Sequence, residues 1–162
     1  MKIAILVHSK SGNTRKFADS LFEKLSADGH NVNLTQLETT APVKQGSVRD
    51  KQEISFSNLP DITDAEAVLF GGPVWAFGPS PVIVAAIRQL GNLKGKSTIS
   101  FATMGFPIKG LGGKAAIRFM DREAGTKGAK VLPGGICSQM CHKLDGDITK
   151  ETERISALLK VL

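Results

Sequence analysis

Short apolar runs alternate with stretches of helical periodicity along most of this chain. Residues 2–7, KIAILV, form an apolar run after Lys2 that is rich in β-branched side chains, which is typical of a strand buried on both faces. Apolar side chains then recur at helical spacing, at Phe17, Leu21 and Leu25. After a glycine that marks the helix exit, residues 31–37 alternate in polarity as a strand does. Together these segments predict a βαβ unit.

The same alternation resumes beyond residue 63. Further strands are expected at residues 65–72, 96–103 and 129–136. Helices are expected from Ser80 as N-cap with Pro81 in the first turn to Gly91, near 113–124, and over a last segment with Ile155, Leu158, Leu159 and Leu162 on one face. Residues 38–63 are polar and hold two prolines, which predicts a long loop with no more than one short turn of helix.

Strands that alternate with helices throughout indicate a parallel sheet with helices on both faces. The chain shows no repeat, low-complexity tract or linker. We therefore expect one domain over residues 1–162, an α/β fold built as a three-layer α/β/α sandwich.

The composition excludes several classes of protein. Hydrophobic residues make up 41% of the 162 and charged residues 22%, as in an ordinary globular chain, and no apolar run approaches the roughly 20 residues of a membrane-spanning helix. No cleavage-site pattern follows an apolar leader, so we expect a cytoplasmic location without membrane insertion. The net charge of +6 is spread along the chain and tyrosine is absent, which favours anionic small molecules or acidic partners and no nucleic acid.

Three loops of unusual composition follow predicted strands. They are HSKSGNT (8–14), GGPVWAFGPSP (71–81) and ATMGFPIKGLGG (102–113). In an open parallel sheet, ligands bind outside the carboxyl ends of the strands. We therefore expect one ligand site built from all three loops.

The first loop has the chemistry of an anion site. Ser9, Ser11 and Thr14 offer hydroxyl donors, and Gly12 lets the backbone approach a ligand closely. Asn13 and Thr14 open a helix whose free N–H groups favour an anion. Neither GxxxxGK[ST] nor GxGxxG is present, so the pattern favours a phosphate bound by neutral donors without Mg²⁺. A serine-rich turn capped by Thr14 is the structural alternative.

The other two loops suit a planar ring. Trp75, the only tryptophan, and Phe77 lie between glycines and prolines, where an aromatic can stack on a flat ligand. In the third loop, Thr103 and the backbone near Met104–Gly105 and Gly112–Gly113 could approach such a ligand. Core packing of Trp75 and a plain glycine-rich connection are the structural alternatives.

These loops also resemble those of a known family. SKSGNT at 9–14 is similar to the flavodoxin phosphate-binding fingerprint (S/T)x(S/T)GNT, and FGGPVWAFGPSP at 70–81 resembles the flavin-flanking loop of the flavodoxin superfamily. ATMGFPIKGLGG is similar to the third flavin loop of the tryptophan-repressor-binding-type quinone reductases. The resemblance covers nearly the whole chain and implies a short-chain, flavodoxin-like fold with a five-stranded parallel sheet of order 2-1-3-4-5.

The resemblance implies non-covalently bound FMN, with the flavin carrying the redox chemistry and no catalytic side chain or metal. The residues that would bind the FMN phosphate are Ser9, Lys10, Ser11, Gly12, Asn13 and Thr14. By the same resemblance, the residues that would flank the isoalloxazine ring and the ribityl chain are Pro73, Val74, Trp75, Ala76, Phe77, Gly78, Thr103, Met104, Gly105, Phe106, Gly112 and Gly113. A backbone group of Gly78 would meet flavin N5 on reduction, because glycine changes conformation without steric hindrance.

The electron partners stay open at this point. One alternative is an electron carrier of the flavodoxin type, which serves a redox partner protein. The other is an FMN-dependent NAD(P)H oxidoreductase acting on quinones or similar acceptors. The chain is basic and lacks tyrosine, unlike typical acidic carriers, and its charge suits NAD(P)H phosphates or acidic partners. The choice between a monomer and a homo-oligomer is not decided.

The remaining reactive side chains favour structural roles. Cys137 and Cys141, with the adjacent His142, could form a redox pair or a partial metal site, but two reduced cysteines are the better interpretation. His8 and His30 have no partner pattern and are expected to be structural. A phosphorylated receiver would need acidic residues after the first strand, and no Ser/His/Asp order indicates a nucleophile.

Overall fold

The computed structural model describes residues 1–50, 52–106, 108, 110–140 and 144–162. Its strands are β1 (Lys2–Val7), β2 (Asn31–Gln36), β3 (Ala67–Trp75), β4 (Gly78–Pro79), β5 (Ser97–Met104) and β6 (Lys130–Ser138). Its helices are α1 (Asn13–Ala27), α2 (Pro81–Gln89), α3 (Gly113–Thr126) and α4 (Leu144–Lys160).

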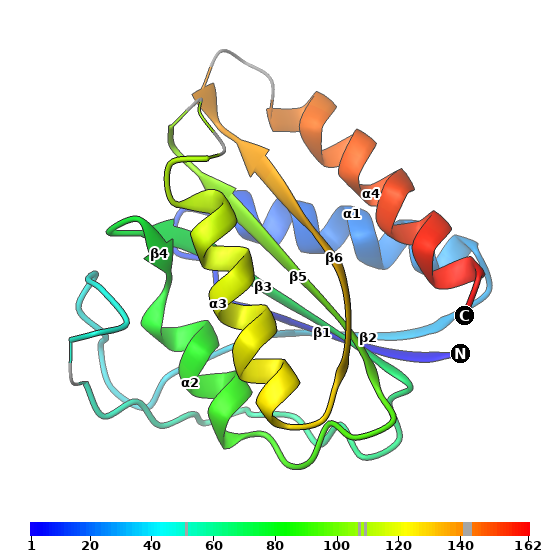
Figure 1. Ribbon diagram of the computed structural model, residues 1–162, viewed down its shortest axis with the longest axis horizontal. Coiled ribbons are helices and arrows are strands. Elements are labelled where there is room, and N and C mark those ends of the chain that lie inside the picture. The colour runs from blue at the N-terminus through cyan, green and yellow to red at the C-terminus, as the bar shows by residue number, and fades with distance from the viewer. Residues whose placement is uncertain (51, 107, 109, 141–143) are drawn as a thin grey trace.

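The five long strands form one parallel sheet in the order β2-β1-β3-β5-β6 (Figure 1). Counted along the chain, these long strands have the predicted order 2-1-3-4-5, so the fold prediction is confirmed. The two-residue β4 pairs antiparallel with the end of β3 and lies off this path. The carboxyl ends of the strands consequently share one edge of the sheet, away from the two chain termini.

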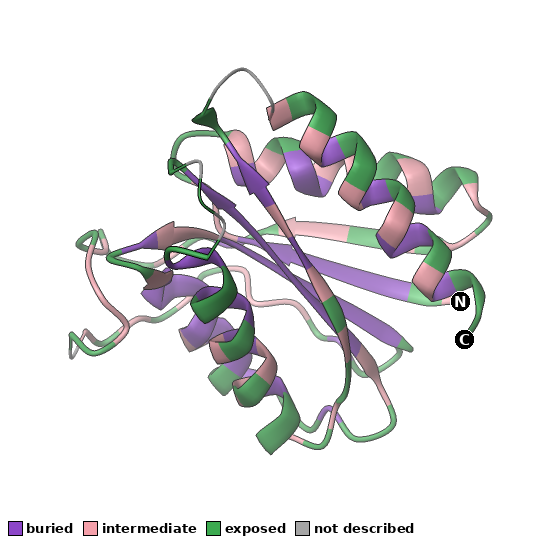
Figure 2. Ribbon diagram, turned by 45° about the horizontal axis from the view of Figure 1, so that its top comes forward, coloured by how far each residue is buried: buried purple, intermediate pink, exposed green. Residues whose placement is uncertain are grey.

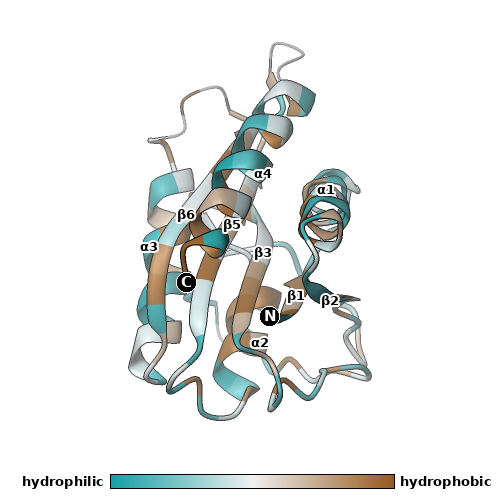
Figure 3. Ribbon diagram, turned by 90° about the vertical axis from the view of Figure 1, so that its right-hand side faces the viewer, coloured by the Kyte–Doolittle hydropathy of each residue, from teal (hydrophilic) through white to brown (hydrophobic). Residues whose placement is uncertain are grey.

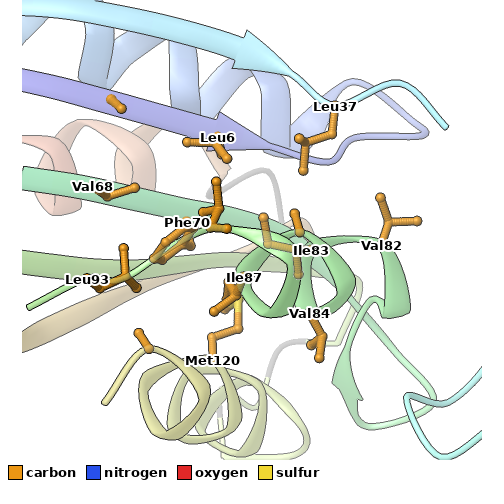
Figure 4. Packing of buried hydrophobic residues seen from close by; sticks show 14 of the residues in the cluster. Leu6, Leu37, Val68, Phe70, Val82, Ile83, Val84, Ile87, Leu93 and Met120 are labelled. Atoms are coloured by element: carbon orange, nitrogen blue, oxygen red, sulfur yellow. The ribbon is translucent and has the colours of Figure 1, made fainter. Parts of the chain in front are cut away.

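Helices cover both faces of the sheet (Figure 2). Helices α1 and α4 pack on one face, where Phe17 and Phe101 meet edge to face with their ring centres 4.9 Å apart. Helices α2 and α3 pack on the other face, where Phe70, Ile83 and Met120 belong to the buried cluster (Figure 4). Figure 3 shows brown apolar stretches in the inner strands of the sheet and helices with teal hydrophilic residues on either side of it, the three layers that the alternating pattern predicts.

The start of α2 follows from local sequence. The Ser80 hydroxyl accepts a hydrogen bond from the Ile83 N–H at 3.4 Å, and Pro81 occupies the first helical position. Both features were expected, because a serine N-cap satisfies a free backbone donor and proline needs none. The helix ends at Gln89 with Leu90 as its cap, one residue before the predicted exit at Gly91.

The long connection after β2 is a loop, as expected. Its described residues, 38–50 and 52–63, contain no turn of helix, and an isolated antiparallel bridge joins Thr39 to Phe56. Leu37 and Ile62 at its two ends are buried in the α2/α3 cluster. The buried side chains of Leu37 and Ile62 therefore hold the two ends of this loop against the α2/α3 cluster.

The ends of β3 and α4 differ from the ends expected from the sequence. β3 continues to Trp75 beyond the expected residue 72, because Gly72 and Pro73 still pair with Ala102 and Thr103 of β5. At the C-terminus, Leu162 is exposed beyond the end of α4 and does not share its buried face. Among the described helices, none combines the length and apolar character needed to cross a membrane.

Candidate cofactor site

Three loops meet at the carboxyl edge of the sheet. The serine loop (residues 8–14) follows β1, the hairpin (residues 73–80) joins β3 to α2, and the glycine loop (residues 104–113, of which 107 and 109 are not described) follows β5. The register holds them together, since Val7 pairs with Gly71 and Pro73 pairs with Thr103. The predicted convergence of the three segments is therefore present in the structure (Figure 1).

The serine loop presents backbone donors without protein acceptors. The Ser9 hydroxyl accepts the Arg15 N–H at 3.1 Å, and the Asn13 amide donates to the Ser11 hydroxyl at 3.3 Å. Gly12 caps α1 with a φ of 89°, and no side chain caps the helix from that position. Within the described chain, no protein group accepts from the backbone N–H groups of Ser11, Gly12, Asn13 and Thr14. Such a row of free donors at a helix N-terminus suits a phosphate.

Behind this loop, Thr14 and Thr103 form a buried hydroxyl pair. Their Oγ1 atoms are 2.6 Å apart, and each residue is 1% exposed. One hydroxyl proton makes this bond, so the second proton remains for another acceptor. The pair connects the start of α1 with the end of β5, two segments that were both expected in the site.

The hairpin places a rare backbone conformation at the site. Ala76 and Phe77 form its turn with φ values of 45° and 62°, while Trp75 and Gly78 pair on either side. Positive φ is unusual for residues other than glycine, and such strain often accompanies functional sites. Gly78 lies in the short ladder next to the turn. Its contact with flavin N5 stays a prediction.

The exposed aromatic side chains at this edge are phenylalanines. Phe77 is 68% exposed on the hairpin turn and Phe106 is 57% exposed in the glycine loop, whereas Trp75 is only 7% exposed. Packing is thus the structural role of Trp75, and its contact with a flavin stays a prediction. Its burial was not visible in the sequence because it depends on a ring from another loop.

That ring belongs to His8. The rings of His8 and Trp75 meet edge to face, with centres 5.1 Å apart and planes at 86°. His8 Nδ1 lies 2.8 Å from the Ser80 hydroxyl. Burial, with a smaller contribution from the positive charge of Lys10, lowers the pKa of His8 from 6.5 to about 4. The imidazole is therefore neutral at pH 7. Sequence reasoning missed this contact because 72 residues separate His8 from Ser80.

Gly112 and Gly113 serve packing in this structure. A Cβ on Gly112, which has a φ of 92°, would lie 2.9 Å from Phe77 Cα, and a Cβ on Gly113 would lie 2.9 Å from Met104 Sδ. The two glycines let the start of α3 approach the hairpin and β5 closely. Their predicted proximity to a flavin is a separate matter and stays a prediction.

The charges around the site favour an anion. The first turns of α1 and α3 contain no acidic residue, and exposed Lys10 and Lys114 flank them. Lys16 is engaged by Asp145 at 2.6 Å. Over the described residues, Lys10 and Lys114 form no ion pair, so both remain available to a negatively charged ligand.

The structure describes part of the cysteine segment. Cys137 is buried in β6, while Cys141 and His142 lie outside the described residues. No group of three or more His, Cys, Asp and Glu side chains suited to a metal ion occurs in the described part of the chain.

Residues 1–120 match the family model of the NADPH-dependent FMN reductases. The chain belongs to this family. The match includes the serine loop, the hairpin and the glycine loop, so all three site segments fall inside it.

Solved structures of flavodoxins and a flavoprotein share the fold. Oxidised flavodoxin 1 from Bacillus cereus aligns with a TM-score of 0.64 and 17% identity over 96% of this chain and 97% of the other. A putative flavoprotein from Bacteroides uniformis gives 0.66 and 15% over 91% and 97%. Two-electron reduced Megasphaera elsdenii flavodoxin gives 0.60 and 18% over 94% and 98%.

Family and fold make the chain a flavodoxin-like, FMN-dependent redox protein. The residues present fit that cofactor. Free N–H groups of the serine loop match the phosphate in chemistry, the unused hydroxyl proton of the Thr14–Thr103 pair adds a donor, and exposed phenylalanines border the edge where a flat ring would lie.

Proposed function

We propose that this protein is an FMN-dependent oxidoreductase that takes electrons from NADPH and passes them to a quinone or a similar small acceptor. The observation that carries the proposal is the match of residues 1–120 to the NADPH-dependent FMN reductases. The carboxylate-poor starts of α1 and α3 support it, because NADPH brings several phosphate charges to the site.

In this proposal the serine loop, Ser9–Thr14, holds the FMN phosphate through hydroxyl and backbone N–H donors. The hairpin residues 73–78 flank the flavin on one side, and Thr103–Phe106 with the Gly112–Gly113 pair flank it on the other. When bound, FMN supplies the hydride and electron chemistry. The chain orients the ring, shields it with Phe77 and Phe106, and attracts the nucleotide through Lys10 and Lys114.

Turnover with purified, FMN-loaded protein tests the proposal. NADPH oxidation is followed in the presence of a water-soluble benzoquinone, with free FMN at the same concentration as the reference. We expect many turnovers per bound flavin. Oxidation of a single equivalent of NADPH, or a rate equal to that of free FMN, would overturn the assignment.

A charge variant sharpens this test. Lys114→Glu, in the first turn of α3, should raise KM for NADPH while leaving kcat close to wild type, because the lysine attracts the nucleotide and takes no part in electron transfer. Lys150→Glu on α4 is the matched control with an exposed lysine on another helix and should change neither constant. Equal KM values in both variants would remove the role given to Lys114.

A flavodoxin-type electron carrier is the second candidate. The observation in its favour is the apolar surface around the site, where Phe77, Phe106, Ile108 and Leu111 are all exposed. Such a patch suits contact with a redox partner protein. Slow reduction by NADPH, together with fast oxidation of the reduced protein by ferricyanide, would favour the carrier.

The proposal also covers the organisation and place of the chain. We propose one FMN-binding domain over residues 1–162 acting in the cytoplasm. Gel filtration of the FMN-loaded protein would establish whether it acts as a monomer or a homo-oligomer.

A further inference from the structure

One histidine ties the end of β1 to the hairpin. His8 follows β1 directly, and its backbone N–H donates to the Gly71 carbonyl at 2.9 Å, which extends the ladder between β1 and β3. Its ring then contacts two residues of the hairpin, Trp75 through the ring edge and Ser80 through Nδ1. The first residue of the serine loop thus contacts the hairpin both before its turn, at Trp75, and at its last residue, Ser80.

The hydrogen bonds at Ser80 define the form of this link. The Ser80 hydroxyl oxygen accepts the Ile83 N–H as the cap of α2, so its own proton is free to be donated. His8 Nδ1 lies 2.8 Å from the hydroxyl oxygen and accepts this proton in one imidazole tautomer, whereas in the other tautomer Nδ1–H donates to the hydroxyl. A neutral imidazole that accepts at Nδ1 carries its proton on Nε2. His8 Nε2 is not among the buried unpartnered atoms of the described chain, so a ligand or water can meet that proton.

The neutral form is maintained by the surroundings. The charged group that acts on His8 is Lys10, in the same loop, and Trp75 and Ser80, which contact the ring from the hairpin, carry no charge. Burial and Lys10 both oppose protonation, and they lower the pKa of His8 to about 4. Protonation would place a donor on Nδ1, so the Ser80 hydroxyl would have to turn and accept from His8 as well as from the Ile83 N–H.

The hairpin needs such a support. Its turn residues Ala76 and Phe77 have positive φ, and the Phe77 side chain is mostly solvent-exposed, so the turn is held by contacts of its backbone with α3 at Gly112 and by its link to the serine loop. We propose that His8 is a positioning residue of the cofactor site, which holds the hairpin on the serine loop through Ser80 and Trp75 in the position where it flanks FMN. The inference rests on the place given to the hairpin under the proposed function.

Affinity for FMN tests the link in the full-length protein. The apoprotein is titrated into FMN while flavin fluorescence is recorded, for wild type, His8→Leu, Ser80→Ala, the double variant and His8→Asn. We expect each of the first two single variants to bind about tenfold more weakly, as loss of one positioned hydrogen bond predicts. The double variant should be no weaker than either, because both remove the same link. His8→Asn should restore affinity, since its amide oxygen can accept from Ser80.

Three outcomes would overturn the proposal: unchanged affinity in His8→Leu, additive losses in the double variant, or equal affinities of His8→Leu and His8→Asn. Ser80→Ala also removes the cap of α2, so its folding is checked by urea denaturation. If that variant does not fold, the comparison of His8→Leu with His8→Asn decides alone.

The single tryptophan supplies a second measurement that needs no flavin. In the apoprotein, Trp75 emission should change with a midpoint near pH 4 as His8 becomes protonated against it. His8→Asn should abolish the transition, and His30→Gln, which removes a histidine far from the hairpin, should preserve it. A transition that survives in His8→Asn contradicts the link. Neither measurement uses NADPH, so failure of the reductase proposal would leave both results intact.

Discussion

The Thr14 and Thr103 hydroxyls lie 2.6 Å apart and are buried, although 89 residues separate them in the chain. They join the serine loop to the end of β5, so the predicted phosphate donors and the predicted flavin-flanking segment are parts of one hydrogen-bonded structure. A substitution at Thr103 should therefore weaken the binding of the FMN phosphate by the serine loop.

Thr103→Val removes one hydroxyl at nearly constant volume and leaves Thr14 Oγ1 buried without its partner. We expect the free energy of unfolding to fall by about 1–3 kcal/mol and FMN to bind more weakly. Thr103→Ser keeps the hydroxyl and should remain close to wild type in affinity. Urea denaturation and FMN titration measure the two effects, and wild-type affinity in Thr103→Val would contradict the coupling.

Gly112→Ala should loosen the contact between α3 and the hairpin. The new Cβ would lie 2.9 Å from the Phe77 backbone in addition to adopting a φ of 92°. Gly29→Ala is the matched control, because Gly29 has a φ of 85° and nothing within 4 Å of the added Cβ. We expect the control to lose about 1–2 kcal/mol of stability from the backbone alone, and Gly112→Ala to lose more and to bind FMN more weakly. Equal losses would show that the hairpin yields to the added methyl group.

Phe77→Gly separates stability from function at the hairpin turn. Glycine adopts the φ of 62° without steric hindrance, so the variant should gain up to about 1 kcal/mol in unfolding free energy. Loss of the exposed ring should weaken FMN binding or raise KM for the acceptor. Ala76→Gly relieves the same kind of strain at the neighbouring residue and keeps Phe77. This variant should therefore gain stability and keep the wild-type affinity for FMN. A Phe77→Gly protein that binds FMN and acceptor as wild type does would exclude a role for the ring.

Stability should depend on pH through His8. Its folded-state pKa of about 4 lies below the value of 6.5 for an exposed histidine, so between these pH values the unfolded chain binds a proton that the folded chain does not. The free energy of unfolding should therefore be highest above pH 6.5 and decrease as pH falls toward 4, by at most about 3.5 kcal/mol at roughly 1.4 kcal/mol per pKa unit.

Urea denaturation at several pH values checks this dependence. His8→Asn does not titrate in this range and should lose less stability between pH 7 and pH 4.5 than the wild type. Parallel pH profiles for the two proteins would mean that other groups cause the acid sensitivity.

Much of the fold and the position of the site could be predicted from the sequence. Apolar periodicity gave the strand at Lys2–Val7 and the stripe of Phe17, Leu21 and Leu25, and Ser80 with Pro81 marked the start of α2. These signals are local, because the spacing of apolar side chains and the chemistry of a helix cap act over a few residues. The resemblance of the serine loop to a known fingerprint then pointed to FMN, in agreement with the family to which the chain belongs.

The sequence determined the elements, their order and the three loops that meet at one edge, since parallel strands bring their carboxyl ends together. Only the tertiary structure decided that Trp75 is buried beside His8, that Phe77 and Phe106 are the exposed rings, and that Thr14 bonds to Thr103. These pairings join residues tens of positions apart. They depend on strand register and on how closely α3 approaches the hairpin. The spacing of apolar residues along the chain predicts neither of these.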